Sequence, residues 1–124
     1  MSVDLKTGLL VLALSSCSQA YSPENEHIMD RIEGGVELPN GARTLDDYAR
    51  YYSTNASGSV IATYTTVVLP SERFHDLPIG KRRWVNNSAN LPNLIGGGCS
   101  TVHVVFYVDT DAFGETACNG NVGH

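Results

Sequence analysis

The glycine run Gly96–Gly98 directly before Cys99 comes closest in this sequence to catalytic chemistry. A cysteine thiolate can act as a nucleophile, and glycine amides can stabilise an oxyanion. Such a thiol needs a base within about 3 Å. His103 is four residues away, which is roughly 13 Å along a strand, whereas His75, followed by Asp76, is the other available base. A thiol-dependent hydrolase or transferase using Cys99 and His75 is therefore one hypothesis, and it requires a free Cys99 thiol.

The sequence gives less support to metal binding or nucleic-acid binding. The four histidines show no paired ligand spacing, and Asp109-Thr110-Asp111 lacks the downstream glutamate of a calcium loop. The net charge is −5, and a basic stripe of the kind that binds nucleic acid is missing. We therefore predict no metal, no cofactor and no nucleic-acid partner.

The most basic stretch is Lys81-Arg82-Arg83, followed by Trp84. Charged residues commonly protect the edge of a sheet from aggregation. We therefore interpret the stretch first as a charged strand edge with Trp84 packed inward. Contact with an anion or a membrane surface through these four residues is the alternative.

The N-terminal region has the pattern of a signal peptide over residues 1–16. Residues 8–14 are an unbroken apolar run, too short for a span of about 20 residues but within the roughly 7–15 of a signal peptide. Leu14-Ser15-Ser16-Cys17 resembles the lipobox of bacterial lipoproteins. The resemblance implies that Cys17 is lipidated and anchors the protein to a membrane surface. Cleavage after Ala20, with a signal peptide over 1–20 and a soluble product, is the alternative.

Cys99 and Cys118 remain as a pair once Cys17, the third cysteine, is lipidated or removed. An odd cysteine would be a liability in an oxidising compartment, and disulfides persist in such compartments. We therefore predict a Cys99–Cys118 disulfide, which closes a loop of about 20 residues.

Residues 17–40 are rich in acidic residues, Pro, Gly and Asn and have no sustained hydrophobic period. This composition predicts a flexible tether. Docking of Ile28, Met29 and Ile32 on the domain, or a short helical turn there, is the alternative. Charge is uneven, because residues 21–47 hold seven acidic residues and residues 48–83 hold five basic ones.

Residues 41–124 are predicted to form a small α+β domain. The spacing of Leu45, Tyr48, Ala49 and Tyr52 predicts a helix over 43–53, and stacking of Tyr51 or Tyr52 on a carbohydrate is a secondary hypothesis.

The sheet of this domain is predicted from four stretches. β-Branched residues over 59–70, the segment 81–85, the strict alternation over 100–108 and a return strand over 115–118 predict an antiparallel sheet of about four strands. The chain would then be one short helix packed on this sheet, with a C-terminal hairpin stapled by the disulfide. If Gly114 closes the hairpin, Cys118 lies near Val105, and the glycine run must fold Cys99 back.

Several short segments, 48–52, 84–85, 91–92, 97–99 and 118–120, resemble small exported bacterial proteins with a Gly-Gly-Cys…Cys-Asn-Gly hairpin. The resemblance implies export and a paired cysteine, and it carries no assigned activity. We therefore expect a non-enzymatic, periplasmic protein of the cell envelope, anchored by lipid, that binds or scaffolds a protein or envelope ligand. A soluble periplasmic or secreted protein of the inhibitor type is a further alternative to the thiol enzyme.

Overall fold

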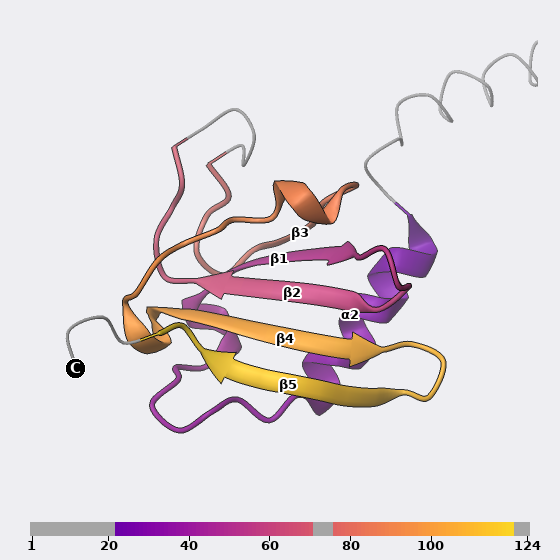
Figure 1. The fold of residues 1–124 in the computed structure, drawn as a ribbon. Helices are drawn as coiled ribbons and strands as arrows, with labels where there is room; N and C mark the ends of the chain where they lie inside the picture. The colour runs from indigo at the N-terminus through magenta and orange to yellow at the C-terminus, as the bar shows by residue number, and fades with distance from the viewer. Residues whose placement is uncertain (1–21, 71–75, 121–124) are drawn as a thin grey trace, which may run out of the picture.

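The structure, a computed structural model, describes residues 22–70 and 76–120. In this part of the chain one α-helix packs against one face of a five-stranded sheet (Figure 1). The elements are α2 (Pro23–Gly35), β1 (Ala49–Thr54), β2 (Val60–Thr65), β3 (Arg82–Trp84), β4 (Thr101–Tyr107) and β5 (Ala112–Cys118), with short 3₁₀ helices at Leu45–Asp47, Ser88–Asn90 and Gly98–Ser100. The α+β class is confirmed.

The sheet has the strand order β3-β1-β2-β4-β5. All neighbouring strands are antiparallel except β1 and β3, which are parallel. β1 and β3 are not consecutive in the sequence, because β2 lies between them along the chain and pairs with the other edge of β1. The sheet is therefore mixed and has five strands, one more than predicted. The strands predicted within 59–70, 81–85 and 100–108 are confirmed as β2, β3 and β4.

The helix predicted over 43–53 is wrong, because a 3₁₀ turn at Leu45–Asp47 leads directly into β1. Tyr48 and Tyr52 pack in the main core, whereas Ala49 and Tyr51 pack in a second core with Leu77 on the other face. Five of the six β1 residues are buried. A strand buried on both faces shows no polar alternation, and its apolar residues matched a helical spacing by coincidence.

The flexible tether predicted over 17–40 is wrong for the part of it that the structure describes. Ser22 caps α2 by accepting a hydrogen bond from the Asn25 amide, and Pro23 occupies the first turn, which are common helix-start features. Ile28, Met29 and Ile32 are buried in the main core against the sheet. The alternative, docking of these three residues, is correct, and the domain extends to the start of α2.

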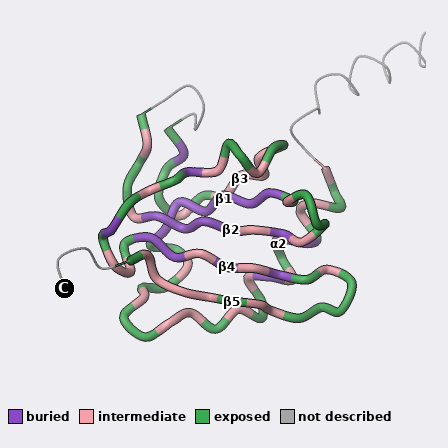
Figure 2. Tube along the Cα trace, in the orientation of Figure 1, coloured by how far each residue is buried: buried purple, intermediate pink, exposed green. Residues whose placement is uncertain are grey.

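The main core lies between α2 and the sheet, and burial is concentrated on β1, β2 and β4 (Figure 2). Its members are Ile28, Met29, Ile32, Tyr48, Tyr52, Val60, Ala62, Tyr64, Val102, Val104 and Phe106. The helix crosses behind the strands in the view of Figure 1. The opposite face of the sheet is covered over β1 by the smaller core around Leu77.

The C-terminal hairpin differs in register from the prediction. The chain turns over 108–111, with Asp111 in the left-handed region (φ 56°), so Gly114 lies inside β5. Cys118 therefore pairs with Val102 instead of lying near Val105. The glycine run has φ values of 70°, 85° and 56°, a conformation that glycine adopts readily. These three residues bend the chain into the 3₁₀ turn that carries Cys99 back to Cys118.

Candidate functional site

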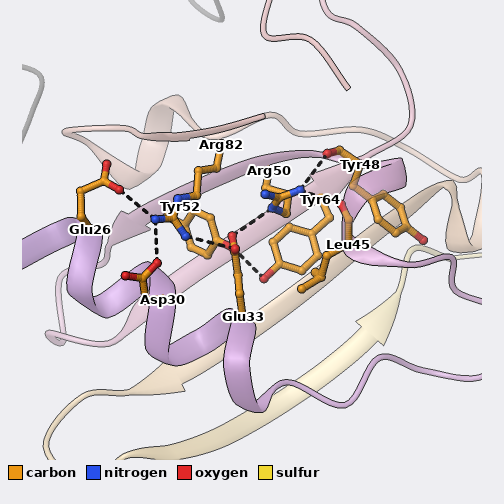
Figure 3. A network of polar contacts seen from close by, with 9 residues as sticks. All are labelled: Glu26, Asp30, Glu33, Leu45, Tyr48, Arg50, Tyr52, Tyr64 and Arg82. Atoms are coloured by element: carbon orange, nitrogen blue, oxygen red, sulfur yellow. Dashed lines mark hydrogen bonds and ion pairs between the residues drawn. The ribbon is translucent and has the colours of Figure 1, made fainter. Parts of the chain in front are cut away.

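The basic stretch at β3 is engaged by the helix. The Arg82 guanidinium lies 2.8 Å from Glu26, 2.8 Å from Asp30 and 3.1 Å from Glu33, all on α2 (Figure 3). Burial alone lowers the pKa of Arg82, but its hydrogen bonds to Asp30 and Glu26 raise that pKa above the usual value. The alternative, contact of Arg82 with an external anion, gains no support, because three carboxylates of the same chain already surround this guanidinium.

The other residues of this stretch follow the strand-edge interpretation. Trp84 packs against the main core, as that interpretation requires. Arg83 pairs in register with Tyr51 of β1, so it belongs to the face opposite α2. Lys81 is exposed, and its backbone amide donates to the Pro78 carbonyl. The four residues therefore do not form one continuous basic surface.

Glu33 is the centre of a buried polar cluster between α2 and the sheet (Figure 3). Its carboxylate accepts hydrogen bonds from Arg50 Nε at 2.9 Å, from Arg82 and from the Tyr52 hydroxyl. The Tyr52 and Tyr64 hydroxyls lie 3.0 Å apart. No local motif in the sequence predicts this cluster, but the separation of acidic residues before 48 from basic residues after it is the relevant signal.

Arg50 links this cluster to the start of β1. Its side chain is 8% exposed, and Nη1 donates to the Leu45 carbonyl at 2.7 Å. A carboxylate, an arginine and tyrosines also occur in catalytic sites, but a catalytic group must reach a substrate. Here Tyr52 and Tyr64 are fully buried under α2. The arrangement holds the helix on the sheet.

The tyrosines proposed for carbohydrate stacking are inaccessible. Tyr51 and Tyr52 are both 0% exposed, so that hypothesis is wrong for these two residues. Burial raises the pKa of Tyr52, and the neighbouring Tyr64 and Glu33 raise it further. Burial also raises the pKa values of Tyr64 and Tyr51.

We expect these three tyrosines to stay protonated at pH values where an exposed tyrosine ionises, near pH 10. The unfolded chain loses those protons above pH 10 while the folded chain keeps them, so the free energy of unfolding falls as pH rises past that point. Titration of the 295-nm absorbance should show Tyr51, Tyr52 and Tyr64 ionising only together with alkaline unfolding. Reversible ionisation of all the tyrosines near pH 10 in folded protein would contradict this expectation.

The predicted Cys99–Cys118 disulfide is confirmed, with Cα atoms 4.6 Å apart. The Tyr48 hydroxyl donates to the Cys99 carbonyl at 2.7 Å, which fixes the same turn to the main core. Because the Cys99 sulfur is bonded to Cys118, the free thiol that the hydrolase hypothesis requires is not present. His75 and the lipidation residue Cys17 lie outside the described residues.

His103 serves a loop contact on the face opposite α2. Its Nε2 lies 3.1 Å from Asn119 Oδ1. The Asn119 amide nitrogen donates to the carbonyls of Leu94 at 2.6 Å and Gly96 at 2.8 Å. The amide oxygen therefore faces His103, which donates to it. Together these bonds hold the loop before the glycine run against the end of the sheet.

A shallow hollow lies at the end of the sheet where both hairpins turn. It has a volume of about 260 Å³ and is lined by residues 57–59 and 107–110. Tyr107, one of the lining residues, is 45% exposed, so an accessible aromatic residue contributes to this hollow. From the sequence, Tyr107 is predicted only to lie on one face of a strand. The alternating pattern does not distinguish an exposed position at a strand end from a covered one.

Within residues 22–70 and 76–120, no group of three or more His, Cys, Asp or Glu side chains is placed to hold a metal ion. In the same part of the chain, none of the helices has the length and apolar character needed to cross a membrane.

The fold is that of a small α+β domain with one disulfide, in which ion pairs hold α2 against the sheet. No protein-family model, no curated protein and no solved structure matches the chain. The resemblance to small exported bacterial proteins therefore stays a prediction.

Proposed function

We propose that the protein is a non-enzymatic, exported protein of the bacterial cell envelope. A lipid on Cys17 anchors it to the membrane surface, and the folded domain binds or scaffolds an envelope component. The observation that carries the proposal is the Cys99–Cys118 disulfide, because such bonds persist in the periplasm and outside the cell and are rare in the cytosol. The apolar run at 8–14 and the lipobox-like Leu14–Cys17 support export and anchoring.

The binding role is supported by the structural contacts of the cysteine and the carboxylate that could otherwise take part in catalysis. Cys99 is bonded to Cys118, and the partly buried carboxylate of Glu33 is engaged by Arg50 and Arg82. Each of these groups has a partner within the domain that accounts for its position. Accessible surface, such as the hollow at Tyr107, is then the part of the domain available for contact with another molecule.

The experiment is to express the full chain in a bacterial host and to follow its partition between detergent and aqueous phases. The wild type is expected in the detergent phase, with an intact mass that starts at Cys17 and includes acyl groups. Cys17→Ala should move to the aqueous phase. Ser16→Ala, which keeps a small residue in the lipobox, is the matched control and should behave as the wild type.

The same samples test the thiol chemistry when they are alkylated with and without reduction. Cys99 and Cys118 should react with iodoacetamide only after reduction. A wild-type product that starts at Tyr21 and stays in the aqueous phase would overturn the anchor. Rapid alkylation of Cys99 without reduction would overturn the non-enzymatic proposal in favour of a thiol enzyme.

A further inference from the structure

Tyr107, the last residue of β4, has its ring held against the backbone of the neighbouring strand. A Cβ atom built on Gly114 of β5 would lie 2.8 Å from the Tyr107 hydroxyl oxygen and 2.9 Å from Cε2. A side chain at position 114 would therefore displace the ring. A glycine inside a strand weakens the strand and marks a close approach, and here it lets the ring of Tyr107 rest on β5 while 45% of the residue stays exposed.

The hollow that Tyr107 helps to line has both apolar residues, Gly58 and Val108, and residues whose side chains can bind hydroxyls. Ser57, Ser59 and Thr110 supply hydroxyl groups and Asp109 a carboxylate. The Asn55 side-chain oxygen accepts hydrogen bonds from the Ser57 amide, the Ser57 hydroxyl and the Ser59 amide at 2.9–3.0 Å. The turn between β1 and β2 is thereby fixed, and the Ser57 hydroxyl is held in place before any ligand arrives.

We propose that this hollow binds one ring of a saccharide. A sugar ring has a face of C–H groups, which packs on the electron-rich face of an aromatic ring, and an edge of hydroxyls, which pair with serine, threonine and carboxylate oxygens. The volume of about 260 Å³ is slightly below the roughly 300–1,000 Å³ of sites for larger ligands, as expected for a single ring.

Charge favours a neutral sugar over an anionic one. Asp109 lies in the lining of the hollow, and the chain as a whole carries net charge −5. A phosphate or carboxylate ligand would be repelled by this field. The inference rests on the proposed binding role in the envelope, and it narrows that role to recognition of a neutral glycan.

The test is titration of ¹⁵N-labelled full-chain protein, as purified from the host, with two probes: the N-acetylglucosamine pentamer and the glucose pentamer. At least one probe at millimolar concentration should shift the amide signals of 57–59 and 107–110. Tyr107→Ala and Gly114→Ala should each weaken binding roughly tenfold. Tyr107→Trp should retain binding. Ile95→Ala, at a 90% exposed residue that does not line the hollow, is the matched control and should not change it.

A lack of amide shifts with both saccharides would overturn the proposal, as would shifts confined to other residues. Shifts at the same residues with tetramethylammonium alone would replace the sugar with a cationic ligand. Amide spectra show whether each variant is folded, so loss of the fold in Tyr107→Ala cannot be mistaken for loss of the site. Saccharide binding is measured whether the purified chain starts at Cys17 or at Tyr21, so failure of the anchor is detected separately by phase partition.

Discussion

Glu33→Gln is expected to lower the free energy of unfolding by about 3 kcal/mol, the usual cost of breaking a buried ion pair by removing one partner. The substitution keeps the size of the side chain and removes its charge. Arg50, with an 8% exposed side chain, would then be a buried cation without a paired carboxylate, with only neutral acceptors such as the Leu45 and Tyr48 carbonyls around it. Urea unfolding followed by circular dichroism, with the disulfide intact, measures the change.

Asp30→Asn is the matched control for this prediction. Asp30 is also on α2 and also bonds Arg82, at 2.8 Å, but its side chain is 66% exposed. Exposed ion pairs contribute at most about 1 kcal/mol, so this isosteric change should cost less than that. Equal losses in the two variants would show that the carboxylates of α2 act as a diffuse charge field and that Glu33 has no special role.

Replacing both bridged cysteines, as Cys99→Ser with Cys118→Ser, is expected to cost about 3 kcal/mol. The chain-entropy model gives this value for a closed loop of about 20 residues, and it is a large part of the roughly 5–15 kcal/mol of a small domain. The bridge joins the turn before β4 to the end of β5, next to the Tyr48 contact with the Cys99 carbonyl. Urea unfolding of the double variant and of reduced wild type should give similar midpoints, both below that of oxidised wild type.

Ser100→Ala is the control for the disulfide. Ser100 is exposed and follows Cys99, and its backbone carbonyl, which accepts from Thr66, is kept in the variant. The expected change is within about 0.5 kcal/mol. An unchanged unfolding midpoint in the double cysteine variant would mean that the bridge does not constrain the unfolded chain.

The sheet was largely predictable from the sequence because β2 and β4 are rich in β-branched residues, which are enriched in strands. The disulfide was predicted from the number of cysteines that remain once Cys17 is lipidated or removed. That prediction did not depend on the register of the hairpin. The register itself was mispredicted, since Gly114 was interpreted as a turn residue. Its actual role, making room for Tyr107, depends on a neighbour across the strands that local pattern does not identify.

The two errors at the N-terminal side have a common physical cause. The acidic residues of α2 suggested a solvated tether, but Glu26 and Glu33 are paired with basic residues of β1 and β3. Ion pairs with residues distant in the sequence thus stabilise carboxylates that the composition suggested would be hydrated. A local signal was nevertheless present, because Ser22-Pro23-Glu24 is a typical helix start. For β1, burial on both faces removed the alternation that would have identified a strand.

The position of α2 at the start of the domain has a consequence for the order of folding. Ribosomes make α2 before the strands of the sheet, but Met29 and Ile32 share their core with Val104 and Phe106, more than 70 residues later in the sequence. Contacts of such separation slow folding, and an isolated helix of this length is marginal in water. Met29 and Ile32 therefore lack the β4 residues of their core until that strand has been synthesised, so α2 becomes stable only when the sheet forms.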